Sequence, residues 1–166
     1  VLKDYQIKRL IIFMNPNVDP RGAGWNIIQS KIAIGAGGIF GKGYLRGTQS
    51  HYRFLPQQST DFIFSILSEE FGFLGCCLVF LLFLFIFIRT IIIIRNSTST
   101  YGAYIASGIL GMFAFHFFVN VGMVMGMMPI TGIPLSFLSY GGSSLLTSMS
   151  CIGLLMSINY RRKEIR

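Results

Sequence analysis

Asp61 stands where a polar segment of the chain meets its first strongly apolar segment, in the run Thr60-Asp-Phe-Ile-Phe64. A carboxylate at such a membrane–water boundary is costly to desolvate and is seldom kept for packing alone. Its position directly before an apolar run also suits a helix N-cap. Composition alone leaves the chemical role and the capping role about equally open.

The four cations that most closely precede this acid are Lys31, Lys42, Arg46 and Arg53, and the chain carries a net charge of +8. The cations are dispersed and no nucleic-acid motif accompanies them, so we exclude a nucleic-acid partner. A basic balance fits anionic lipid headgroups or an anionic lipid-linked substrate better. The glycines from Gly35 to Gly43 do not form a phosphate loop, because a preceding strand and a Gly-Lys-Ser/Thr ending are both missing.

The elements that must position these residues are helices in a membrane. Of the 166 residues, 52% are hydrophobic and 12% are charged, about half the charge of a typical soluble domain. We expect an all-α, polytopic membrane protein with three transmembrane helices at about residues 71–88, 101–125 and 139–159. Residues 1–70 are expected to form a long extracytoplasmic loop with short amphipathic helices, and residues 71–166 the helical bundle.

Cations near the ends of the expected helices predict the orientation. Arg89 and Arg95 flank one short link, and Arg161, Arg162 and Lys163 follow the last helix. Positive charge in short loops marks the cytoplasmic side, whereas loops longer than about 60 residues are largely exempt. We therefore expect a cytoplasmic C-terminus and an outer loop of residues 1–70.

Other polar residues have simpler interpretations. Cys76, Cys77 and Cys151 lie in apolar runs and suggest buried helix thiols rather than a disulfide framework. His116, within a run of phenylalanines, is expected to be a hydrogen-bonded histidine of the bundle. No His, Cys or carboxylate cluster has the spacing of a structural metal site. The chain begins Val1-Leu2 without an initiator Met, which leaves open that an upstream part precedes it.

Two long ordered blocks resemble a known family. The first runs from Asp19-Pro-Arg-Gly-Ala-Gly-Trp25 through Gly47-Thr-Gln49 to Thr60-Asp-Phe-Ile-Phe64, and the second from Asn120-Val-Gly-Met-Val-Met-Gly126 to Ser139-Tyr-Gly-Gly-Ser-Ser144. Together they resemble the C-terminal part of the SEDS proteins (shape, elongation, division and sporulation), and their details are closer to the RodA branch than to the FtsW branch. The chain departs from the family where Gln57, Gln58 and Ser59 replace a common Glu-X-His, and where Ser136 replaces a common Pro.

The resemblance implies a peptidoglycan glycosyltransferase that polymerises lipid II at the outer face of the bacterial inner membrane, with a class B penicillin-binding transpeptidase as partner. The family's essential loop acid maps onto Asp61, which would act as general base. Lys31, Lys42, Arg46 and Arg53 would stabilise charge on the pyrophosphate leaving group. Further candidate substrate-binding residues are Gln29, Ser139, Gly141, Gly142 and Ser143.

Two rival functions remain open. A flippase for lipid-linked precursors would need ionisable groups along the membrane helices, and a non-catalytic scaffold would tolerate loss of Asp61. No cofactor is certain, although a divalent cation that bridges Asp61 and the pyrophosphate is conceivable.

Overall fold

The computed structural model describes residues 9, 11–14, 23–44, 46–47 and 60–164, and it contains no strand within these ranges. Four long helices carry this part of the chain: α2 (Ala23–Gly37), α4 (Ile63–Arg95), α5 (Thr100–Val124) and α6 (Gly142–Glu164). The expected all-α fold is confirmed.

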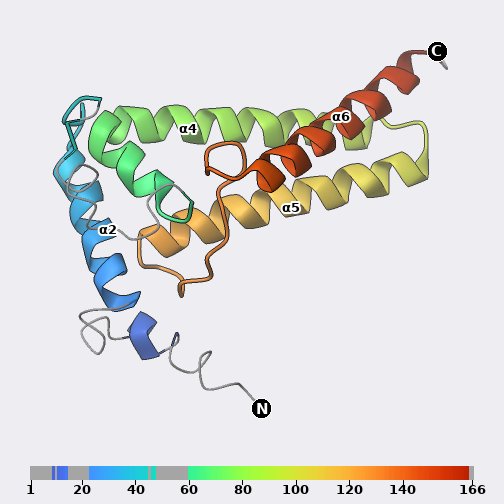
Figure 1. Ribbon diagram of the computed structural model, residues 1–166. Helices are drawn as coiled ribbons and strands as arrows, with labels where there is room; N and C mark the ends of the chain where they lie inside the picture. The colour runs from blue at the N-terminus through green and yellow to red at the C-terminus, as the bar shows by residue number, and fades with distance from the viewer. Residues whose placement is uncertain (1–8, 10, 15–22, 45, 48–59, 165–166) are drawn as a thin grey trace.

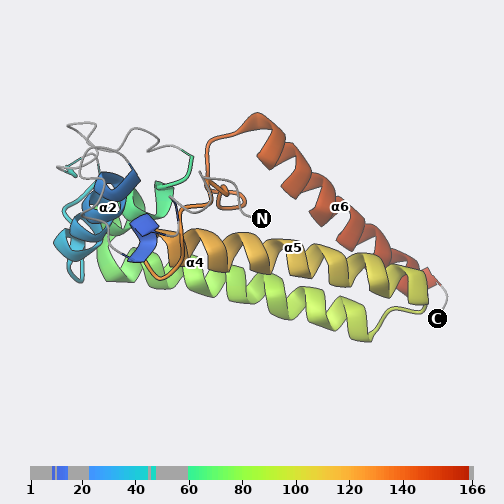
Figure 2. The ribbon, with the colours of Figure 1, turned by 90° about the horizontal axis from the view of Figure 1, so that it is seen from below.

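Helices α4 and α5 run side by side, and the short link 96–99 joins them at one end. Helix α2 crosses the opposite end of this pair (Figure 1). After α5 the chain passes through a non-helical segment, residues 125–141, and then returns along α6. Seen from below, α6 starts well away from α5 and approaches it toward the C-terminal end (Figure 2).

Two of these helices, α4 and α5, are long and apolar enough to span a membrane. The third expected span, residues 139–159, corresponds to α6, which begins only at Gly142 because residues 125–141 are not helical. Helix α6 is long enough to span, but its many serines leave it outside the apolar candidates among the described residues. The third transmembrane helix therefore stays a prediction.

The first expected span, residues 71–88, lies within a longer helix. Helix α4 starts eight residues earlier and continues to Arg95, with non-helical backbone at Gly72. Gly72 has φ +64°, and Gly41, opposite it, has φ +78°. A Cβ atom on Gly72 would collide with the backbone of Ile39 and Gly41, and one on Gly41 with that of Glu70. The helix bends where two backbones meet without side chains between them.

Phenylalanines fill the interface between α4 and α5. Phe83 and Phe117 have ring centroids 4.6 Å apart, and Phe80 meets Phe117 edge to face at 5.2 Å. Buried Phe62, Phe64 and Leu135 join this core cluster, so the segments around Asp61 and after α5 are anchored by apolar packing as well as by hydrogen bonds.

Candidate active site

Two buried polar side chains hold the backbone around Asp61. Asn120, on α5, donates from Nδ2 to the Asp61 carbonyl oxygen at 3.0 Å and to the Ile133 carbonyl oxygen at 2.8 Å. Ser139 donates from Oγ to the Thr60 carbonyl oxygen at 2.6 Å and accepts a hydrogen bond from the Leu135 backbone N–H at 2.7 Å. Asn120 and Ser139 are both buried. The turn that carries the acid is therefore tied to α5 and to the segment after it.

The side chain of Asp61 does not take part in this network. Helix α4 begins at Ile63, its N-cap residue is Phe62, and no side chain caps it. The capping interpretation of Asp61 is therefore wrong. Its carboxylate is partly exposed and makes no hydrogen bond or ion pair with any described residue. It lies against Gly132, where a Cβ atom would come 3.3 Å from Oδ2, so a fixed backbone presents an unpaired carboxylate.

Lys31 lies on the face of α2 that meets the end of α5. Its side chain contacts Gly126, and the neighbouring Ser30 donates to the Val124 carbonyl oxygen at 2.8 Å. Arg9 reaches the same segment after α5, where it donates to the Ile130 carbonyl oxygen at 3.2 Å. These two cations therefore border the segment that also contains Gly132, beside Asp61.

Lys42 has a different environment. Its Nζ lies 2.9 Å from Oε1 of Glu69, whose side chain is fully buried, while 31% of the Lys42 side chain is exposed. The backbone continues this contact, since the N–H groups of Lys42 and Gly43 donate to the carbonyl oxygens of Glu69 and Glu70 at 3.0 Å each. Glu69 follows Asp61 by about two helical turns along the chain. This pairing favours a structural role for Lys42 over the predicted contact with substrate.

The remaining predicted site residues are spread over the same end of the molecule and over the start of α6. Arg46 is exposed after the turn at Gly43, Gln29 is mostly buried in α2, and Arg53 lies outside the described residues. Gly141, Gly142 and Ser143 form the entry to α6, where Ser143 is exposed.

A small cavity of about 110 Å³ lies beneath this entry, between α5, α6 and the segment before α6. His116, Ser136 and Ser148 line it together with Thr147, and Nδ1 of His116 lies 3.3 Å from Oγ of Ser136. The expected polar partner of His116 is thus a serine at the position where the family often has proline.

Asn120 is the site residue that sequence reasoning missed. The sequence shows it only as a member of a family-like block, without a role of its own. The available signal was an Asn within a strongly apolar segment, because an amide group at membrane depth needs hydrogen-bond partners. Its Oδ1 atom is buried and has no hydrogen-bond partner among the residues that the structure describes.

No group of three or more His, Cys, Asp and Glu side chains within the described residues could hold a metal ion. A cation at Asp61 would therefore need most of its ligands from outside this set of side chains.

An apolar helical pair long enough to span a membrane, with an acid at one end that is unpaired among the described residues, is the arrangement expected of a membrane protein with a polar site at the membrane boundary. The model of the FtsW/RodA/SpoVE family, described as cell cycle proteins, matches residues 1–164. The chain belongs to this family.

Similar proteins include the peptidoglycan glycosyltransferase RodA of Treponema pallidum (strain Nichols), which is 70% identical over 162 residues, 98% of this chain and 37% of that protein. The peptidoglycan glycosyltransferase MrdB of Escherichia coli (strain K12) is 45% identical over 99% of this chain and 45% of its own length. Stage V sporulation protein E of Bacillus subtilis (strain 168) is 46% identical over 93% of this chain and 42% of its own length.

A solved structure described as "Structural coordination of polymerization and crosslinking by a peptidoglycan synthase complex" contains a similar chain. The TM-score is 0.78 at 30% sequence identity, over 97% of this chain and 43% of that one. The chain thus spans less than half the length of the relatives it matches.

Proposed function

We propose that this protein is a peptidoglycan glycosyltransferase that polymerises lipid II, the undecaprenyl-pyrophosphate-linked disaccharide peptide, for cell elongation. The observation that carries the proposal is the arrangement at Asp61. Asn120 and Ser139 fix the backbone on either side of the acid, and its carboxylate has no partner among the described residues. The names of the similar proteins support the same activity.

Asp61 acts as general base in this proposal. Its carboxylate takes the proton from the acceptor sugar hydroxyl while that oxygen attacks the anomeric carbon of the donor. The bond from this carbon to the polyprenyl pyrophosphate breaks, and the leaving group keeps the electron pair. A single displacement inverts the anomeric centre and needs no protein nucleophile. Positioned bases of this kind contribute about 10²–10⁴-fold in rate.

Cations near the site would stabilise the charge that develops on the pyrophosphate. Lys31 and Arg46 are exposed and suit this role better than Lys42, which is paired with Glu69. Helix α2 and Asp61 would face outward, with the link 96–99 and the C-terminal end of α6 in the cytoplasm. Arg95 beside that link and Arg161 near the end of α6 agree with the positive charge expected on that side.

A class B penicillin-binding transpeptidase is the proposed partner, since it would crosslink the new glycan strand. The similar chain in the peptidoglycan synthase complex supports this pairing.

Polymerisation of lipid II by the complete gene product with its transpeptidase tests the proposal. Asp61→Asn keeps the size of the side chain and removes the base, so glycan formation should fall by about 10²-fold or more. Asp61→Glu keeps the carboxylate but displaces it by one methylene group, and it should recover part of the activity.

Normal expression and normal complex formation of both variants would exclude misfolding as the cause of a loss. Polymerisation by Asp61→Asn at the wild-type rate would contradict the general-base role and favour a flippase or a scaffold.

A further inference from the structure

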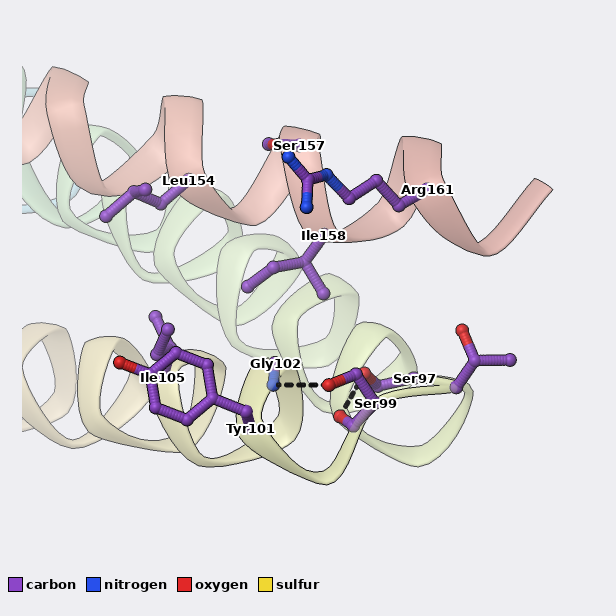
Figure 3. Close-up of a pocket in the computed structure, with 10 residues that line it drawn as sticks. Ser97, Ser99, Tyr101, Gly102, Ile105, Leu154, Ser157, Ile158 and Arg161 are labelled. Atoms are coloured by element: carbon purple, nitrogen blue, oxygen red, sulfur yellow. Dashed lines mark hydrogen bonds between the residues drawn. The ribbon is translucent and has the colours of Figure 1, made fainter. Parts of the chain in front are cut away.

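A second cavity, of about 390 Å³, lies at the opposite end of the molecule from Asp61. The link between α4 and α5 and the facing ends of α5 and α6 enclose it (Figure 3). None of the residues that line it has a role in the proposed reaction. The lining residues are Ser97, Thr98, Ser99, Tyr101, Gly102, Ile105, Leu154, Ser157, Ile158 and Arg161.

The polar part of this lining suits an anionic oxygen group. Arg161 is the charged residue of the lining, and its side chain runs along α6 toward Ser157 (Figure 3). Ser157 and Tyr101 add hydroxyl groups from the two facing helices. Guanidinium and hydroxyl donors together are a common way to bind phosphate oxygens, and bonds from guanidinium are the stronger ones. None of the lining residues that the structure describes is acidic, so this part of the lining carries the positive charge of Arg161 without a carboxylate.

The other part of the lining is apolar. Ile105, Leu154 and Ile158 form it. Leu154 and Ile105 lie toward the middle of the bundle, and Ile158 lies beside Ser157 and Arg161 (Figure 3). A cavity with Arg161 and Ser157 toward the helix end and Leu154 and Ile105 farther along the bundle matches a ligand with an anionic head and an acyl tail. A free phosphate ion would use the first part and leave the second part empty.

Gly102 keeps the two helices close at this point. A Cβ atom there would lie 3.1 Å from Oγ of Ser97 and 3.4 Å from Cγ2 of Ile158. Ser97 is itself held by a hydrogen bond from its Oγ to the Ser99 carbonyl oxygen at 2.9 Å. The walls of the cavity are therefore set by local contacts within the chain.

The depth of the cavity selects the source of the phosphate. It lies at the end of both apolar helices that can span a membrane, where Arg95 ends α4. Lipid headgroups occupy this depth, and anionic headgroups attract basic residues there. We propose that this cavity binds the headgroup phosphate of an anionic phospholipid, with Arg161 as its main charged contact.

Native mass spectrometry of the complete gene product in a zwitterionic detergent tests this proposal. Phosphatidylglycerol and phosphatidylcholine of the same chain length are titrated separately, and inorganic phosphate is added to the phosphatidylglycerol titration as a competitor. Phosphatidylglycerol should bind about tenfold more tightly than phosphatidylcholine, and inorganic phosphate should not compete at equal concentration. Arg161→Gln should weaken phosphatidylglycerol binding by about tenfold, the usual effect of losing one charge-assisted hydrogen bond.

Arg95→Gln is the matched control. It removes the same charge at the same end of the molecule, but Arg95 is exposed and does not line the cavity. Its effect on phosphatidylglycerol binding should stay below about threefold, as expected for a solvent-screened charge. Arg161→Lys should fall between wild type and Arg161→Gln, because it keeps the charge and loses the planar donor pair.

Equal losses for Arg161→Gln and Arg95→Gln would overturn the site and leave only a general surface attraction. Competition by inorganic phosphate at equal concentration would overturn the lipid as the source. The measurement is independent of the proposed glycosyltransferase activity, because Asp61→Asn should bind phosphatidylglycerol as wild type does.

Discussion

Asp61 and Glu69 are two acids at the same end of the molecule, and their surroundings are opposite. Glu69 is completely buried and pairs with Lys42 at 2.9 Å. Asp61 is partly exposed, and its carboxylate has no partner among the residues that the structure describes. At Glu69 the contact is made to the carboxylate of the side chain, by Lys42. At Asp61 the contacts are made to the backbone, where Asn120 and Ser139 donate to the carbonyl oxygens of Asp61 and Thr60.

This difference separates an acid that supports structure from one that is available for chemistry. A buried carboxylate loses its hydration, and the ammonium group of Lys42 compensates part of that cost at Glu69. An acid that pairs with a cation is a poor base, because the cation stabilises its charged form. Anchoring the backbone instead of the carboxylate fixes the position of Asp61 and leaves its oxygens free to accept a proton.

The largest effect on stability is expected when Lys42 is removed. Lys42→Met removes the cation that lies 2.9 Å from the fully buried Glu69, and breaking a buried pair in this way should lower the free energy of unfolding by about 3 kcal/mol. Thermal unfolding in detergent measures the loss. Asp61→Asn, measured in parallel, should leave stability within about 0.5 kcal/mol of wild type, as is usual for a partly exposed side chain without partners.

The double variant Lys42→Met, Glu69→Leu is the control for this prediction. Replacing both members of a buried pair by apolar side chains is often close to neutral, so most of the lost stability should return. Polymerisation activity should return with it. A stable double variant without activity would instead mean that Lys42 contacts the substrate, and it would break the comparison between the two acids.

A smaller effect is expected for Asn120. Asn120→Ala leaves the carbonyl oxygens of Asp61 and Ile133 without the donor that both share, which should cost about 2 kcal/mol of stability. The turn would then hold Asp61 less firmly, so kcat for polymerisation should fall by about tenfold with little change in KM.

Val119→Ala, at the adjoining position of α5, is the control variant for Asn120→Ala. It removes a partly buried apolar side chain and touches none of these hydrogen bonds. Its kcat should therefore stay close to that of wild type. A fall in kcat of equal size in Val119→Ala would show that α5 packing, and not the bond to Asp61, sets the rate.

Apolar patterning predicted much of the fold. Helix α5, expected at residues 101–125, lies at Thr100–Val124, and the link after Arg95 was also placed correctly. The expected span of residues 71–88 covered only part of α4, and the bend at Gly72 was not predicted. The bend depends on the contact between Gly41 and Gly72, which are distant from each other in the sequence. Local helix propensity contains no information about such a tertiary contact.

The candidate site shows the same limit. Asp61 was identified from its type and its place at the boundary of an apolar run. The partners that distinguish it from Glu69 are distant in sequence, since Asn120 is 59 residues from Asp61 and Lys42 is 27 residues from Glu69. The cations that precede Asp61 therefore looked equivalent, and only tertiary structure separates Lys42 from Lys31.

The smallest expected effect concerns the neutral pair His116 and Ser136, which extends the comparison from charged to uncharged groups. Ser136 is buried, and its Oγ lies 3.3 Å from Nδ1 of His116. If charge rather than polarity makes a partner necessary, Ser136→Ala should lower stability by less than about 1 kcal/mol, the usual net value of one neutral hydrogen bond. Polymerisation should stay within about twofold of wild type, as for most changes away from the reacting groups. A loss of stability as large as that of Lys42→Met would mean that any buried polar group at this depth needs a hydrogen-bond partner. Burial, rather than charge, would then explain why Glu69 is paired.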